Sequence, residues 1–357
     1  MTLILHEESP PSGYERLIYV EDTDCGLEAF ICIHSTVCGP AAGGCRMWDY
    51  ANKDDARKDV LRLAKGMTAK NAVAGLGLGG GKSVIIGDAR KSKSEPMLRT
   101  FGKAVNAFGG IYYTAEDVGM SPDDMRLVAQ ETPYAVGLEG GEFGSGDPSP
   151  FTAEGVFQCL KVGAEEVFGT SDLKDRRVLV QGLGHVGMPL AEKLYASGAD
   201  LIVSDINEVA VDRTRRDLDA EICPVDKVFD VEMDIFAPCA LGGVLTEQTA
   251  QRLTARLICG AANNQLETDQ VAETLRARGI RYLPDFVVNA GGIISVATEI
   301  HRVGQEFREA RLKDVAARIR EILDLSNKTG ISTTQVTKDI VMDILKSAEH
   351  TQRKVHA

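Results

Sequence analysis

The chain has 357 residues, of which 44% are hydrophobic and 26% are charged, and its formal net charge at pH 7 is −12. A chain of this length exceeds one ordinary hydrophobic core and suits two domains. Because nucleic acids and anionic membranes attract basic surfaces, the acidic balance argues against both as partners.

The N-terminal residues and the cysteines narrow the class of protein further. Residues 1–8 lack the basic start and the long apolar core of a signal peptide, so we expect a cytoplasmic protein. The eight cysteines include no Cys-x-x-Cys pair, and the six histidines are scattered along the chain. We therefore expect reduced, buried thiols and no metal site.

The first predicted strand covers residues 28–35, and a tight turn with a second extended piece follows at residues 39–47. Apolar residues at helical spacing predict a helix from Lys53 to Lys65. This helix leads into the segment from Gly66 to Lys82, which is dense in glycine. Glycine suits places where the backbone approaches something closely or takes a positive φ.

Two lysines of this segment, Lys70 and Lys82, suggest a chemical role. Lys82 is expected where a loop passes into the short apolar strand of residues 82–87. An amine pressed against apolar surroundings is costly to keep charged, which makes Lys82 a candidate general base. Lys70, just beyond the predicted helix, suits the binding of an anion. A flexible surface loop with two solvated lysines is the alternative.

Asp117 is the next candidate. A helix is predicted from Pro96 to Phe108, and a strand over residues 111–118 carries Asp117 near its end. Ser121 then begins another helix, with proline at its first position and two acids in its first turn. Helix capping and the helix dipole explain those two acids. Asp117 has no such explanation.

Residues 137–150 are rich in glycine and proline and form the clearest domain boundary. Beyond it, a helix is expected from Thr152 to Phe168, followed by a buried strand over residues 177–181.

This strand leads directly into the glycine loop Gly182-Leu183-Gly184-His185-Val186-Gly187, and then into a helix from Met188 to Ser197. In such a unit the first glycine makes the turn, the second admits a pyrophosphate and the third packs the helix on the strand. The next strand ends in Asp205, which would bind the ribose hydroxyls and repel a 2′-phosphate, so NAD is preferred over NADP. A βαβ unit without a nucleotide is the alternative.

The later predicted strands end in small or amide residues. Ligands of doubly wound sheets bind beyond the carboxyl ends of the strands, which places Asn263, Asn264 and Asn289 near a cofactor or substrate. An asparagine in a turn is more often a cap for the backbone than a ligand.

Taken together, seven stretches in this order resemble one enzyme family: residues 39–46, 66–82, 115–119, 182–187, 237–240, 260–265 and 284–292. The chain resembles the amino-acid dehydrogenases that act on glutamate, leucine, phenylalanine or valine, and is most similar to those specific for leucine. The resemblance implies a two-domain α/β fold with the active-site cleft between the domains. An N-terminal α/β substrate domain would cover residues 1–136, with the helices of residues 334–357 packing back on it. A Rossmann-type doubly wound NAD-binding domain would cover residues 137–333.

The resemblance also implies a reaction, in which an amino acid, NAD and water give a 2-oxo acid, ammonium and NADH. Lys82 matches the catalytic lysine of the family, Asp117 the acid that partners it, and Lys70 the lysine that holds the α-carboxylate. The remaining matches are amide or hydroxyl residues: Asn264 resembles the residue that orients the substrate, and Thr152, Asn263 and Asn289 resemble contacts near the nicotinamide.

Specificity follows from what the chain lacks. Glutamate-specific members of the family have a lysine at the position of Ala42 and a serine at that of Val296, and the matching Ala115 and Ile293 are apolar too. An acidic side chain would be desolvated there without a partner, at a cost of several kcal/mol. We therefore expect leucine, valine or isoleucine as the substrate. The small Ala42 keeps a phenylalanine dehydrogenase open as an alternative.

Two further alternatives are a 2-hydroxy-acid dehydrogenase and a protein that binds NAD without turnover. The first chemistry usually relies on a histidine base, and none lies in the lysine-bearing motifs. The second would not need both Lys70 and Lys82. The family resemblance implies a homo-oligomer.

Overall fold

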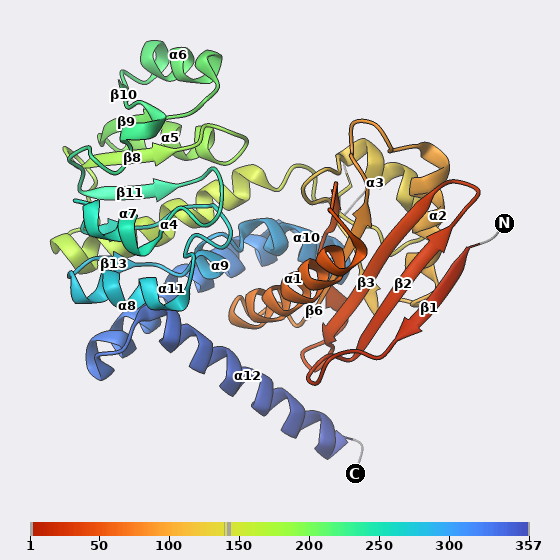
Figure 1. The fold of residues 1–357 in the computed structure, drawn as a ribbon. Helices are drawn as coiled ribbons and strands as arrows, with labels where there is room; N and C mark the ends of the chain where they lie inside the picture. Colours follow the sequence, from red (N-terminus) through yellow and green to blue (C-terminus); the bar gives the residue numbers. More distant parts are fainter. Residues whose placement is uncertain (1–2, 139, 141–143, 356–357) are drawn as a thin grey trace. The chain divides into compact units, whose positions relative to one another are not determined.

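We describe the protein from a computed structural model, which describes residues 3–138, 140 and 144–355. The chain forms two compact units (Figure 1). The first unit comprises residues 1–148, 293–308 and 341–357, and the second comprises residues 149–292 and 309–340. Residues 293–308 thus belong to the first unit, whereas the sequence analysis assigned them to the nucleotide-binding domain.

The first unit is built on a mixed sheet. Among the residues described, seven strands form it, in the order β1-β2-β3-β6-β4-β7, and β5 pairs with β6 beside this path. Strands β1, β2, β3 and β6 pair antiparallel, whereas β4 and β5 run parallel to β6, and β7 runs parallel to β4. The strands are β1 (Ile4–Glu8), β2 (Arg16–Asp22), β3 (Leu27–Ser35), β4 (Ala41–Ala42), β5 (Cys45–Trp48), β6 (Gly79–Ile86) and β7 (Tyr112–Tyr113).

Alternating apolar side chains let this sheet carry helices on both faces. In β2, Leu17 and Tyr19 belong to a core cluster with residues of α1 (Lys53–Val73), whereas Ile18 and Val20 belong to a cluster with α2 (Glu95–Asn106) and α3 (Pro122–Ala129). Because successive residues of a strand point to opposite faces, one strand serves both cores. The predicted Ser121 is the N-cap of helix α3 and forms a capping box with Asp124.

Helix α1 packs directly on β6 because glycines leave no side chains at the contact. A Cβ atom on Gly80 would lie 2.1 Å from the backbone nitrogen of Thr68, and one on Gly79 would lie 2.1 Å from the carbonyl oxygen of Ser35. The fully buried Asn71 of α1 donates from Nδ2 to the carbonyl oxygens of Ala42 and Gly79. The glycine segment therefore lets protein backbone approach protein backbone.

Two local predictions for this segment were wrong. Helix α1 extends to Val73, so Lys70 lies within the helix and not beyond it. Strand β6 begins at Gly79, so Lys82 lies inside the strand and not where a loop enters it. Three glycines have low strand propensity, but pairing with β3 and β4 holds them extended.

The second unit is built on a parallel sheet. Its six strands among the described residues have the order β10-β9-β8-β11-β12-β13, and every pairing is parallel. This is the order of a doubly wound dinucleotide-binding fold, with the switch point between β8 and β11. The strands are β8 (Arg177–Gln181), β9 (Asp200–Ser204), β10 (Glu221–Ile222), β11 (Ile235–Pro238), β12 (Leu257–Ile258) and β13 (Arg281–Tyr282).

Helices connect the strands of the second unit, as right-handed parallel crossovers require. The connecting helices are α5 (Gly187–Ala196), α6 (Glu208–Asp217), the short 3-10 helix Val225–Lys227, α7 (Glu247–Arg252) and α8 (Asp269–Ala277). Helix α4 (Ser149–Phe168) precedes β8, and α9 (Asp285–Val288) follows β13. Three further helices have residues in both units: α10 (Gly291–His301), α11 (Gln305–Thr329) and α12 (Thr333–Val355). No helix in the described ranges combines the length and the apolar character needed to cross a lipid bilayer.

Candidate active site

An ion pair joins the buried Lys82 and the partly buried Asp117 in the first unit. Lys82 is only 5% exposed, and its Nζ lies 2.8 Å from Oδ2 of Asp117. Strand β6 positions the lysine, and the extended segment that follows β7 positions the aspartate. The two segments are linked through β5, because Cys45 of that strand pairs with Ser83 and with Glu116. The structure therefore brings together two residues that the sequence analysis selected.

Asp117 is held in its ionised form. Burial by itself would raise the pKa of Asp117, but the positive charges of Lys82 and Arg46 outweigh it and lower the pKa to about 2. Arg46 of β5 donates from Nε to Oδ2 of Asp117 at 3.1 Å, so the two cations share one carboxylate oxygen. Asp117 is therefore ionised at neutral pH and lies beside an amine that is almost excluded from solvent, an arrangement suited to proton exchange.

An apolar cluster adjoins Asp117 along the chain. Ala115, Val136 and Val296 are buried together, and Tyr113, Ile293 and Ile300 pack against them. Tyr113, Ala115 and Asp117 are spaced by two, so an extended backbone directs them to the same face. Three of the four apolar residues proposed from the sequence, Ala115, Ile293 and Val296, thus meet in one cluster. The fourth, Ala42, is buried in β4, where it pairs with Tyr113.

Two polar side chains of helix α10, Glu299 and His301, anchor it within the first unit. Oε2 of Glu299 accepts hydrogen bonds from the backbone nitrogens of Gly137, Leu138 and Ser145 and from the Ser145 hydroxyl, at 2.9 to 3.4 Å. Nε2 of His301 lies 2.7 Å from the carbonyl oxygen of Leu76, in the glycine segment. These contacts fix the helix that carries Ile293 and Val296.

Lys70 lies in the last turn of α1 and is half-buried. Its helix also carries Thr68 and Asn71, whose contacts with β6 and β4 fix this turn against the sheet. The structure thus places Lys70 on the helix that packs against the strand of Lys82.

The glycine loop of the second unit has the geometry of a phosphate-binding turn. Gly182 has a φ of +98°, which a side chain would strain, and a Cβ atom on Gly187 would lie 1.8 Å from the carbonyl oxygen of Gly182. A Cβ atom on Gly184 would instead meet nothing within 4 Å. The three glycines thus serve a turn, an open approach and close helix packing, in the order expected for a dinucleotide. His185 and Val186 complete the loop, and His185 is exposed.

Asp205 follows β9 and closes onto this loop. Its Oδ2 accepts a hydrogen bond from the backbone nitrogen of Leu183 at 2.5 Å, and its Oδ1 accepts one from that of Asn207 at 2.7 Å. The carboxylate therefore lies beside the glycine turn, with its position set by two backbone donors.

The amide residues lie at the carboxyl edge of the same sheet. Asn289 donates from Nδ2 to Oδ1 of Asn263 at 2.8 Å and to the carbonyl oxygen of Ala261 at 3.1 Å. Its own Oδ1 is buried without a hydrogen-bond partner. A buried acceptor without a donor is costly, so a ligand with an amide or hydroxyl donor fits here. Asn264 has a φ of +52° and is exposed, and Thr152 of α4 is buried.

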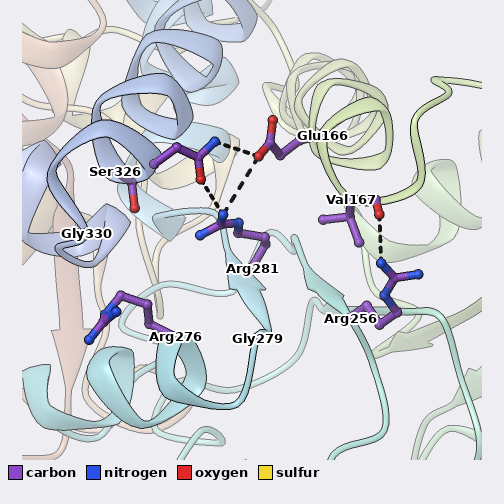
Figure 2. Close-up of a pocket in the computed structure, with 9 residues that line it drawn as sticks. Glu166, Val167, Arg256, Arg276, Gly279, Arg281, Ser326 and Gly330 are labelled. Atoms are coloured by element: carbon purple, nitrogen blue, oxygen red, sulfur yellow. Dashed lines mark hydrogen bonds and ion pairs between the residues drawn. The ribbon is translucent and has the colours of Figure 1, made fainter.

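The second unit also has a pocket of about 400 Å³, which lies near the amino-terminal ends of β12 and β13 (Figure 2). It is lined by three arginines, Arg256, Arg276 and Arg281, and none of the residues selected from the sequence lines it. Each arginine already has a protein partner: the carbonyl oxygen of Val167 for Arg256, Glu273 for Arg276, and Asn327 with Glu166 for Arg281. The pocket is therefore no part of the candidate site.

Sequence analysis missed several residues of the site. Arg46 lay within a recognised motif but was given no role, because its contact with Asp117 spans 71 residues of sequence. Val136 and Glu299 carry no local signal either, since each acts through contacts that only the fold creates.

Comparison with known proteins identifies the family. Residues 14–134 match the Glu/Leu/Phe/Val dehydrogenase dimerisation domain, and residues 207–352 match the Glutamate/Leucine/Phenylalanine/Valine dehydrogenase family. The crystal structure of L-tryptophan dehydrogenase from Nostoc punctiforme superposes with a TM-score of 0.82 at 35% identity, covering 95% of this chain and 97% of that one.

Similar proteins of known activity are amino-acid dehydrogenases too. A leucine dehydrogenase from Thermoactinomyces intermedius is 46% identical over 89% of this chain and 87% of its own length. A valine dehydrogenase from Streptomyces albus is 44% identical over 87% and 86%, and a phenylalanine dehydrogenase from Caldalkalibacillus thermarum is 38% identical over 94% and 92%. Dehydrogenases of this family use NAD(P). The chain therefore belongs to the glutamate/leucine/phenylalanine/valine dehydrogenase family and is an amino-acid dehydrogenase.

Proposed function

We propose that the chain catalyses the oxidative deamination of a branched-chain aliphatic L-amino acid, with NAD as the cofactor, and the reverse reductive amination. The substrate would be leucine, valine or isoleucine, and the products the 2-oxo acid, ammonium and NADH. The observation that carries this proposal is the Lys82–Asp117 ion pair, whose aspartate lies two residues along the chain from Ala115 of the apolar cluster.

Lys82 and Asp117 would move the protons. Oxidation leaves an imine, to which water adds before ammonia departs, and each of these steps transfers a proton. In this proposal Lys82 exchanges protons with the attacking water and the carbinolamine, and Asp117 partners Lys82 and handles the proton of the amino group. Because the amine and the carboxylate lie 2.8 Å apart, Lys82 can exchange its proton without losing its hydrogen bond to Asp117.

Lys70 and Asn264 would bind the substrate. A positively charged lysine suits the α-carboxylate, which every amino-acid substrate carries, and an asparagine can orient the substrate through hydrogen bonds. Both roles follow from the family resemblance and agree with the half-buried position of Lys70 and the exposed position of Asn264.

The apolar cluster supports the proposal that the substrate has an aliphatic side chain. Its six residues, three buried and three partly buried, include no charged side chain and only the hydroxyl of Tyr113 as a polar group. Burying the carboxylate of glutamate against such a surface would cost several kcal/mol, whereas a leucine side chain gains about 2 kcal/mol by burial. With Ala42 also buried in β4, the proposal favours aliphatic substrates over acidic ones.

NAD would bind at the carboxyl edge of the second unit's sheet. Gly182, Gly184, His185, Val186 and Gly187 would surround the pyrophosphate, and Asp205 would accept hydrogen bonds from the ribose hydroxyls. Thr152, Asn263 and Asn289 would lie near the nicotinamide, whose carboxamide donors match the unpaired Oδ1 of Asn289. When bound, the cofactor supplies the hydride acceptor, and the protein supplies binding and orientation.

We also propose that the protein is a homo-oligomer. The match of residues 14–134 to a dimerisation domain supports this assignment.

A substrate panel tests the proposed function. Purified protein is mixed with NAD and each amino acid in turn, and NADH formation is followed by absorbance. Turnover with leucine, valine or isoleucine, and none with glutamate, is the expected result. Preferred turnover of phenylalanine or tryptophan would overturn the aliphatic assignment, and NAD binding without turnover of any amino acid would overturn the reaction.

A further inference from the structure

Two cations meet at a single oxygen of Asp117. Lys82 Nζ lies 2.8 Å from Oδ2 and Arg46 Nε lies 3.1 Å from the same atom. Both cations are largely buried: the Lys82 side chain is 7% exposed and that of Arg46 is 20% exposed. Such charge-assisted bonds fix the direction of a carboxylate as well as its charge.

Arg46 is itself held from the opposite side. Its Nη1 donates to Oδ2 of Asp59 in α1 at 2.9 Å, and the Tyr50 hydroxyl donates to the same oxygen at 2.8 Å. Arg62, one turn along α1, donates to the other oxygen, Oδ1, at 2.7 Å. The guanidinium therefore bridges two carboxylates, and its planar geometry allows both contacts at once.

We propose that Arg46 is a positioning residue, which holds the Asp117 carboxylate ionised and directed at Lys82. The inference rests on the proposed function, because it assigns Arg46 a part in the proton exchange of Lys82 and Asp117. Arg46 acts through Asp117 and is not itself given a contact with the substrate. Asp117 faces two charged groups, Lys82 of β6 and Arg46 of β5. Arg46 in turn faces the carboxylate of Asp59 in α1 and the hydroxyl of Tyr50, which precedes α1.

Lys82 and Arg46 share Oδ2 of Asp117 as an acceptor, and Lys82 alone would not hold this carboxylate throughout the reaction. A lysine that exchanges protons is neutral for part of its cycle, and at those moments it no longer holds Asp117 electrostatically. A guanidinium stays charged throughout, because arginine does not lose its proton in proteins. Arg46 would then keep both the orientation and the charge of the carboxylate while the charge on Lys82 changes.

The test compares Arg46→Met with Arg62→Met. Each variant removes one arginine from Asp59, but only the first removes a contact with Asp117. For Arg46→Met we expect kcat to fall between about 10- and 100-fold, because the carboxylate is no longer directed. The acid limb of the profile of kcat against pH should move to higher pH by about 1 unit or more, because one of two neighbouring cations is gone. Arg62→Met should change neither quantity.

A conservative variant and a readout without catalysis complete the test. Arg46→Lys keeps a positive charge but cannot bridge two carboxylates, so we expect the acid limb to return toward that of the wild type while kcat recovers only in part. The carboxyl signal of Asp117 in protein labelled with [4-¹³C]aspartate, assigned by its loss in Asp117→Asn, should titrate at a higher pH in both Arg46 variants than in the wild type, and least so in Arg46→Lys.

The outcomes separate the inference from the proposed function. If the wild type turned over no amino acid, the proposed function would be wrong. The effect of Arg46 on Asp117 would still be tested by the carboxyl titration, and it would be refuted if the Asp117 signal titrated at the same pH in Arg46→Met as in the wild type. If the wild type is active and Arg46→Met matches Arg62→Met in both pH profile and carboxyl titration, the inference is wrong. If Arg46→Met does not fold, the same comparison is made with Arg46→Lys.

Discussion

The two glycine-rich segments of this chain look alike in sequence and differ in what their glycines touch. In the segment of the first unit, a side chain on Gly80 would collide with Thr68 of α1, and one on Gly79 would lie 2.1 Å from the carbonyl oxygen of Ser35. In the second unit, a side chain on Gly184 would meet no protein atom within 4 Å. Around Gly79 and Gly80 the first segment therefore packs against protein backbone, whereas the second leaves room beside Gly184.

This difference shows how to interpret glycine motifs. A run of glycines indicates close approach, but not whether the approaching group is protein or ligand. In the first unit the close packing places Lys82 within a strand and nearly excludes it from solvent. In the second unit the open position lies in the loop just before α5 begins at Gly187, where the dipole of a helix favours phosphate. One segment would serve chemistry and the other nucleotide binding.

The largest effect is expected from Lys82→Ala. Loss of the proton-exchanging amine should lower kcat by about 10²- to 10⁴-fold, measured as NADH formation with the best amino-acid substrate. Lys91→Ala, which removes a lysine that is 82% exposed, serves as the control and should leave kcat within about twofold of the wild type. Near-normal turnover in Lys82→Ala would show that the first segment does not serve the chemistry.

Alanine substitutions at two glycines near the contact of α1 and β6 should change stability in opposite directions. Gly80→Ala forces a Cβ atom against backbone and should lower the free energy of unfolding by about 1 to 3 kcal/mol or more. Gly66→Ala, in α1 where nothing lies within 4 Å, should raise it by about 0.5 to 1 kcal/mol. Denaturant unfolding of both variants checks this, and equal effects would refute the packing role of Gly80.

Because of the ion pair between Lys82 and Asp117, the free energy of unfolding should depend on pH. The folded-state pKa of Asp117, about 2, lies below its usual unfolded value. Its stabilisation is therefore fully present above about pH 4 and is lost as the pH falls through the folded pKa. Wild type and Asp117→Asn should differ in unfolding free energy by about 2 to 3 kcal/mol at pH 6, and by less as the pH approaches 3. A difference that does not depend on pH would contradict the charge of Asp117 as its source.

The smallest predicted effect concerns the choice of cofactor in the second unit. Asp205→Asn keeps an oxygen acceptor for one of the two backbone donors and removes the negative charge that would repel a 2′-phosphate. We expect the preference for NAD over NADP, as a ratio of kcat/KM values, to fall about tenfold. Asp200→Asn, at the exposed start of the same strand, is the matched control. An unchanged ratio would remove Asp205 from the nucleotide site.

The sequence predicted best what is encoded locally. The turn at Gly182, the helix packing at Gly187 and the position of Asp205 depend on residue types within one βαβ unit, so their spacing was sufficient. The capping box at Ser121 was predictable for the same reason. The pairing of Lys82 with Asp117 came from the family resemblance, and the structure supplies its distance.

What the sequence could not predict depends on contacts between distant segments. Strand β6 begins with three glycines, which form a strand only because β3 and β4 flank them. Strands β1 and β2 went unrecognised, since β1 is largely exposed and lacks the alternation of a half-buried strand. Asn289 was expected at the end of a strand, but β13 ends at Tyr282 and Asn289 instead follows α9 (Asp285–Val288). Arg46, Val136 and Glu299 gained a role only from the fold.

The most direct test of the contrast between the two segments is the dissociation constant for NAD, measured by calorimetry in Lys82→Ala and Gly184→Val. If the first segment serves chemistry and the second nucleotide binding, Gly184→Val should weaken NAD binding at least about tenfold, because its side chain fills the space a pyrophosphate needs. Lys82→Ala should bind NAD within about threefold of the wild type. The reverse pattern, with weakened binding in Lys82→Ala and normal binding in Gly184→Val, would contradict this assignment of the two segments.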